Sequence, residues 1–147
     1  MIFLFHKINI VKALDNYKLL VFFSEGVTKI YDVKPLFEKF LVFNNLKKDV
    51  LFDECRVDVG GYGVSWNDEI DLSCDELFNN GELTNTPFDN LIALSDATIL
   101  WGLNESTLRK AISYGKLQEG IDVMKYGKQW IITMEAMVRE YGEPKSR

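Results

Sequence analysis

The sequence predicts an α+β protein in which a small antiparallel-sheet domain is followed by a winged helix-turn-helix domain. Apolar and polar residues alternate at strand-like spacing in much of the first part of the chain, whereas apolar residues recur at helical spacing in the last third. Between these parts, residues 79–90, NNGELTNTPFDN, have no apolar periodicity. We therefore expect domains at residues 1–83 and 92–147, joined by a linker at 84–91.

The bulk composition indicates a folded protein without a membrane span or a metal site. The 147 residues are 47% hydrophobic and 13% aromatic, which is enough for a packed core. The apolar opening Met1–Phe5 is too short for a signal segment or a span, so we expect a cytoplasmic protein. Cys55 and Cys74 lack CxxC spacing and accompany a single histidine, His6. We expect reduced thiols, no metal and no cofactor.

The first elements along the chain are a hairpin and a short helix. The β-rich runs YKLLVFF and VTKIYDV flank Ser24, Glu25 and Gly26, a turn signal. Pro35 then begins the helix PLFEKFL, in which apolar residues recur at helical spacing.

A second hairpin and a second helix follow. ECRVDV alternates apolar and polar residues, Gly60-Gly61 supplies the turn, and YGVSW continues the alternation. The expected inward positions are Cys55, Val57, Val59, Tyr62, Val64 and Trp66. Ser73 and Glu76 form a capping box that begins the helix.

This part of the chain resembles a bacterial family, the domain of unknown function two-four-four-two. The resemblance runs from Tyr17 to Phe78 and rests on LLVFFSEGVTKIYDVKPLF and FDECRVDVGGYGVSWNDEIDLSCDELF. The chain departs from the family at Asn67, where members tend to have proline. Members resemble small α+β domains, are sometimes fused to a helix-turn-helix, and are often encoded beside a toxin-like partner. The resemblance implies an antitoxin or regulator role.

The segment LSDATILWGLNESTLRKAISYGKL predicts a helix-turn-helix. Ser95 caps a first helix that ends at Trp101 and Gly102, and Asn104 caps a second one. Gly115 stands where a left-handed residue usually ends a helix. Two short helices joined by a glycine-containing turn of three or four residues are typical of this motif.

The second helix, residues 105–114, has two distinct faces. Leu108, Ala111 and Ile112 stand at i, i+3 and i+4 and should pack on the first helix. The opposite face consists of small polar and cationic residues, namely Ser106, Arg109, Lys110 and Ser113. A helix about 15 Å long with such a face is suited to a DNA major groove. A solvated polar face is the alternative interpretation.

The segment IDVMKYGKQWIIT predicts a tight hairpin with Gly127 and Lys128 at its tip. Lys125 and Lys128 would contact DNA phosphates, or would serve solubility alone. Thr133 is expected to cap a last helix.

GLNESTLRKAISYGKL followed by KYGKQWIIT resembles the winged helix-turn-helix of the mercury-resistance-regulator and phage-excisionase class. By that resemblance Ser106, Thr107, Arg109 and Lys110 face the groove. We expect no long coiled coil or effector-binding domain of that class beside it, and therefore no ligand-triggered control by that class's mechanism. The complete set of candidate DNA-binding residues is Ser106, Thr107, Arg109, Lys110, Ser113, Lys116, Lys125, Lys128 and Gln129.

Charge is unevenly distributed along the chain, whose net charge is −5. Residues 1–90 hold 9 basic and 15 acidic residues, a net −6, whereas residues 91–147 hold 8 basic and 7 acidic residues, a net +1. The run NDEIDLSCDE does not have EF-hand spacing. It could bind a basic partner, or form a solvated loop and a helix start. Its candidate partner-binding residues are Asp68, Glu69, Asp71, Asp75 and Glu76.

No GxSxG, Walker or HExxH motif occurs, so we do not expect an enzyme. The sequence favours an autoregulatory, antitoxin-like transcriptional regulator that binds double-stranded DNA as a homodimer. Its acidic domain would mediate dimerisation or capture a small basic toxin-like protein. The alternative is a protein-binding antitoxin or adaptor whose helix-turn-helix serves only as an interface.

Overall fold

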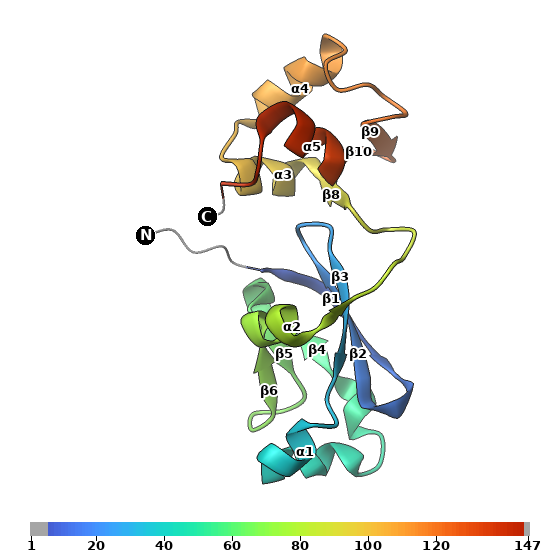
Figure 1. Ribbon diagram of the computed structural model, residues 1–147, viewed down its shortest axis with the longest axis vertical. Helices are drawn as coiled ribbons and strands as arrows, with labels where there is room; N and C mark the ends of the chain where they lie inside the picture. The colour runs from blue at the N-terminus through green and yellow to red at the C-terminus, as the bar shows by residue number, and fades with distance from the viewer. Residues whose placement is uncertain (1–5, 146–147) are drawn as a thin grey trace. The chain divides into compact units, whose positions relative to one another are not determined.

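The computed structural model describes residues 6–145, which form two compact units. The N-terminal unit comprises residues 6–87, and the C-terminal unit comprises residues 88–145 of the described chain. In the described residues the N-terminal unit has two antiparallel sheets and the C-terminal unit has one (Figure 1). Each unit also has its own buried apolar residues. This is the predicted α+β organisation.

The N-terminal unit is built on a four-stranded antiparallel sheet. Its strands are β1 (Ile8–Leu14), β2 (Lys18–Phe23), β3 (Thr28–Asp32) and β7 (Glu82–Leu83), in the order β1-β2-β3-β7. The predicted first hairpin is confirmed, since residues 18–22 of β2 pair with the whole of β3. Strand β1 is outside the predicted elements, because exposed Asn9, Ile10 and Lys12 interrupt its apolar pattern.

A second, three-stranded sheet contains the glycine hairpin. It consists of β4 (Arg56–Val57), β5 (Gly63–Ser65) and β6 (Asp71–Ser73), with a 3₁₀ turn at Val59–Gly61. Val64 and Trp66 are buried as predicted, but Val59 is 98% exposed and Tyr62 is 62% exposed. The alternation fails there because β4 ends at Val57 and the chain has already entered the turn.

The first helix of this unit is shorter than the sequence indicates, and the second begins at the predicted cap. Helix α1 spans only Leu36–Lys39, and Phe40 has an extended backbone before 3₁₀ turns at Leu41–Lys47 and Leu51–Glu54. Helix α2 spans Cys74–Asn80, and the Ser73 hydroxyl accepts a hydrogen bond from the Glu76 amide at 3.1 Å, so this cap is confirmed. The Glu76 carboxylate does not complete a capping box. It instead accepts a hydrogen bond from the Tyr31 hydroxyl at 2.7 Å, which links α2 to β3.

Trp66 is buried in the N-terminal unit. Its indole nitrogen donates to the Phe52 carbonyl at 2.9 Å, and its ring stacks on Phe52 with centroids 5.9 Å apart. Near the first hairpin, buried Glu25 accepts from the His6 ring at 2.9 Å. His6 therefore has a structural partner within the N-terminal unit.

The C-terminal unit combines three helices with a three-stranded antiparallel sheet of order β8-β10-β9. Its elements are β8 (Leu91–Ala93), α3 (Leu94–Trp101), α4 (Glu105–Ser113), β9 (Val123–Tyr126), β10 (Gln129–Thr133) and α5 (Met134–Tyr141). Leu91, which the sequence placed in the linker, pairs with Thr133 as part of β8.

The core of this unit is contributed by the two helix-turn-helix helices, the sheet and α5. Trp101, Leu108, Leu117, Ile132 and Met137 are each at most 1% exposed. Full burial of such side chains contributes roughly 1.5–3 kcal/mol each. The Trp101 indole also donates to the Gly142 carbonyl at 2.7 Å, which fixes the end of α5 against α3.

The predicted caps of this unit are partly right. Thr133 caps α5 by accepting from the Ala136 amide at 3.1 Å, and Asn104 is the N-cap residue of α4, without a side-chain hydrogen bond. The prediction for Ser95 is wrong, because β8 leads directly into α3 and Ala93 takes the N-cap position. Ser95 lies in the first turn, where its carbonyl accepts from the Thr98 hydroxyl. Among the described residues, no helix is long and apolar enough to cross a bilayer.

Candidate nucleic-acid interface

Helices α3 and α4 are joined by a three-residue turn, residues 102–104. Gly102 has φ +63°, a left-handed conformation that ends α3 without a steric penalty. Leu108 and Ala111 are buried, and α4 packs on α3 through this apolar stripe. The stripe fixes which side of α4 faces outward.

The outward side of α4 carries the residues that the sequence assigned to the major groove. Ser106, Thr107, Arg109, Lys110 and Ser113 are all exposed. The nine-residue helix is about 14 Å long at 1.5 Å per residue. It ends one residue earlier than predicted, with Tyr114 as its cap and Gly115 left-handed at φ +84°. The structure therefore brings these five side chains together on one solvent-facing surface.

Arg109 is held by Glu105 one turn earlier on α4. The Glu105 Oε1 atom accepts from Arg109 Nη2 at 2.6 Å and from Nε at 3.2 Å. Both side chains remain about half exposed, at 55% and 52%. This i,i+4 pair restricts the guanidinium to one side of the helix. Within the described residues, Lys110 makes no ion pair and presents an unneutralised charge.

The second part of the candidate interface is the β9–β10 hairpin. Tyr126 pairs with Gln129, which leaves Gly127 and Lys128 as a two-residue tip, as predicted. Gly127 adopts φ +64°. The Lys125 ammonium lies 5.3 Å from the centroid of the Trp130 ring on the neighbouring strand. Lys128 and Gln129 are exposed, so the hairpin presents a basic tip.

Asp122 anchors the loop that joins α4 to the hairpin. Its carboxylate is buried, accepts from the Gln118 amide at 2.9 Å, and receives two bonds from Arg139 of α5 at 3.0 and 3.1 Å. The hydrogen bonds from Arg139 hold the pKa of Asp122 below its ordinary value. This pair ties the hairpin's first strand to α5.

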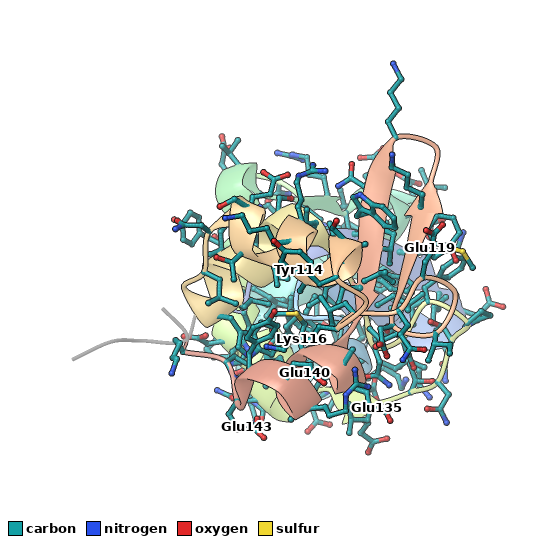
Figure 2. All side chains as sticks on the ribbon, turned by 90° about the horizontal axis from the view of Figure 1, so that it is seen from above. Tyr114, Lys116, Glu119, Glu135, Glu140 and Glu143 are labelled. Carbon is teal, nitrogen blue, oxygen red and sulfur yellow. The ribbon has the colours of Figure 1, made fainter. Side chains whose placement is uncertain are left out.

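Lys116 occupies a different environment from the other candidate lysines. Its ammonium is 4.0 Å from Glu140 and 4.9 Å from the centroid of the Tyr141 ring. Figure 2 shows Lys116 beside Glu140; Glu135 also belongs to α5, and Glu143 follows the end of that helix. The C-terminal unit therefore has an acidic α5 as well as a basic α4 and hairpin.

Tyr114 is a candidate contact that the sequence reasoning missed. The side chain is 82% exposed at the end of α4, as labelled in Figure 2. The apolar spacing of α4 stops at Ile112, so an aromatic residue beyond it has no place in the core. That break in periodicity is the signal that could have identified it.

The five acidic candidates of the N-terminal unit do not form one cluster. Asp71 and Glu76 line a groove, whereas Asp68 and Glu69 lie in the loop after Trp66. Asn67 shapes that loop by accepting from the amides of Glu69 and Ile70, both at 2.9 Å. Asp75 lies in the first turn of α2.

The two cysteines are free thiols in separate places. Burial raises the pKa of both Cys55 and Cys74, and the nearby carboxylates of Asp53 and Asp75 act in the same direction. In the described part of the chain, no group of histidine, cysteine and carboxylate side chains could hold a metal ion.

Two helices joined by a short turn, with a polar outward face on the second, define a helix-turn-helix domain. In agreement, the family model described as a helix-turn-helix domain matches residues 84–146. The family model described as a protein of unknown function, DUF2442, matches residues 8–82, and the chain belongs to that family. The two-part resemblance is thus confirmed. No curated protein matches the chain, and no solved structure matches it.

Proposed function

We propose that this protein is a sequence-specific transcriptional regulator that binds double-stranded DNA and controls its own operator. The observation that carries the proposal is the outward face of α4, which combines exposed hydroxyl and cationic side chains and has no large apolar residue within it. Such a helix can enter a major groove and form hydrogen bonds with base edges. The helix-turn-helix domain itself supports DNA as the partner.

In this proposal α4 reads bases and the β9–β10 hairpin acts as a wing on the phosphate backbone. Ser106 and Thr107 lie near the N-terminal end of α4, the end that contacts base edges in such motifs. Arg109 is suited to a bidentate contact with guanine, since its guanidinium is already restrained by Glu105. Lys125 and Lys128 would contact phosphates as point charges that carry no sequence information.

Dimerisation is part of the proposal because one C-terminal unit offers few phosphate contacts. Residues 91–147 carry a net charge of only +1, and Lys116 is already close to Glu140. Phosphate neutralisation supplies most of the non-specific affinity for DNA. Two copies on half-sites about 34 Å apart would double the contacts of one copy.

The second candidate function is that of an antitoxin or adaptor that binds a small basic, toxin-like protein. It is favoured by the net charge of −6 over residues 1–90. If the toxin-binding site and the DNA-binding surface are coupled, the bound partner could alter the affinity for the operator, and the operator would alter the affinity for the partner equally. The helix-turn-helix would contribute either DNA binding or only a protein interface.

The test is fluorescence anisotropy of a duplex from the protein's own upstream region with the full chain and with the double variant Arg109→Ala, Lys110→Ala. We expect the variant to lose specific binding while its circular dichroism is unchanged. Lys12→Ala with Lys48→Ala removes the same charge from exposed positions of the N-terminal unit and is the matched control. Unchanged binding by the α4 variant, or equal loss in the control, contradicts the proposal.

A further inference from the structure

A groove of about 870 Å³ crosses the N-terminal unit, independently of the DNA-binding surface. Strand β3, helix α1, strand β6 and helix α2 all contribute to its walls. This volume is in the range of sites that hold ligands of several hundred daltons. Its lining shows which kind of ligand would be retained.

The floor of the groove is apolar. It includes Leu36, Phe43 and Leu72, each less than 9% exposed. Phe40, which also lines the groove, is 54% exposed, because the backbone leaves α1 in an extended conformation at this residue. A large aromatic ring left in water at the edge of an apolar floor is a surface that a partner's apolar side chain would cover.

The rim of the groove is negatively charged. Its lining contains two ammonium groups, Lys18 and Lys39, and four carboxylates, Asp32, Asp71, Glu76 and Glu82.

Two of these carboxylates have partners within the unit. Asp32 pairs with Lys34 at 2.9 Å, and Glu76 accepts from Tyr31. Within residues 6–145, Asp71 and Glu82 make no ion pair, and both are exposed. Lys18 and Lys39 make no ion pair in this part of the chain either, so the negative balance of the groove rests on four lining carboxylates against two ammonium groups.

We propose that this groove binds a short basic peptide segment of a partner protein, with an apolar residue on Phe40 and lysine or arginine side chains toward Asp71 and Glu82. Lysine and arginine suit such a lining, because their methylene stems pack on apolar surface while their charged ends reach carboxylates. The excess of carboxylates disfavours a nucleic-acid strand, whose phosphates they would repel.

The experiment is a selection from a random heptapeptide phage library on the immobilised full-length protein, followed by anisotropy of the enriched peptides. We expect enrichment of peptides that combine lysine or arginine with an aromatic or aliphatic residue. Asp71→Lys with Glu82→Lys should weaken these peptides at least about tenfold, since two attractive pairs become repulsive. Phe40→Ser should weaken them by a smaller factor.

The matched control is Asp68→Lys with Glu69→Lys, which makes the same change of charge in the loop after Trp66, outside the groove. This control should retain binding, and circular dichroism should show that both variants are folded. Lack of basic enrichment, or equal binding by the groove variant, overturns the proposal. Complete competition by spermidine would indicate a site for small cations instead. The selection uses no DNA, so its result is independent of operator binding.

Discussion

The two units of this chain differ in charge and in how charge is arranged on them. The N-terminal unit is acidic overall, and its groove has an excess of carboxylates. The C-terminal unit is almost neutral. Two of its cations lie on α4 and two on the β9–β10 hairpin, whereas its carboxylates are spread over α3, α4, the loop before β9, α5 and the segment after α5. A net charge of −5 for the whole chain therefore does not exclude DNA as a partner. Partners of opposite charge could be bound by different units.

The largest expected effect is a loss of stability in the C-terminal unit that leaves the N-terminal unit unchanged. Leu108→Ala should destabilise the C-terminal unit by about 2–5 kcal/mol, since it removes most of a fully buried side chain from that core. The measurement is urea unfolding followed by circular dichroism and by tryptophan fluorescence. Trp66 reports on the N-terminal unit, and Trp101 and Trp130 report on the C-terminal one. The Trp66 signal is isolated in a background that lacks Trp101 and Trp130. If Leu108→Ala shifts the urea midpoint of this signal as much as that of the C-terminal unit, the two units unfold together.

The next effect concerns base reading by α4. Arg109→Ala should cost about 1–3 kcal/mol of discrimination at one base pair, roughly five- to 160-fold in relative affinity. Anisotropy against a panel of single-base operator variants measures this. Glu105→Gln keeps the shape of the side chain but weakens its hold on Arg109, and should lower discrimination less. If Arg109→Ala instead weakened binding equally to every operator variant, Arg109 would contact a phosphate and not a base.

A smaller effect should appear as pH dependence of the C-terminal unit. Because Arg139 lowers the pKa of Asp122 in the folded state, this carboxylate contributes stability above its unfolded pKa of about 3.9. That contribution is lost as the pH falls through the lower folded value. Asp122→Asn should be less stable than the wild type at pH 7, and the difference should shrink below about pH 4. A constant difference across this range would contradict the assignment.

The smallest effect compares two lysines of the C-terminal unit. Lys128→Ala should reduce the salt slope of DNA binding by about 0.9, as expected for loss of one phosphate contact. Lys116→Ala should change the slope less, because Lys116 already lies near Glu140 and over Tyr141. Anisotropy titrations at several salt concentrations give both slopes. Equal changes would place Lys116 among the phosphate contacts.

Local patterns predicted much of the C-terminal unit. Apolar spacing in α4, the tip of the β9–β10 hairpin and the left-handed Gly115 each depend on residues close together in the chain. The start of α3 was not predictable in this way. The sequence pointed to Ser95, but pairing of β8 with the distant strand β10 moves the N-cap to Ala93. The pair between Glu105 and Arg109 was not predicted either, since its hydrogen bonds depend on side-chain conformation.

The N-terminal unit was harder to predict because its features depend on long-range contacts. The first hairpin is local and was found, but β1 has too little apolar alternation to be recognised. Val59 was assigned inward from alternation alone, although the strand ends before it. The groove joins residues from Lys18 to Glu82, and no local pattern relates Asp71 to Glu82. The acidic run therefore predicted only two of the groove's lining residues, Asp71 and Glu76.

The most direct test of the account is an anisotropy titration of the full-length protein against its own upstream duplex and a scrambled duplex, at two salt concentrations. We expect a preference of at least about a thousandfold for the upstream duplex, in the range of specific regulators. Affinity for this duplex should fall steeply as the salt concentration rises. Equal, weak binding to both duplexes would contradict DNA reading by α4 and favour a protein partner.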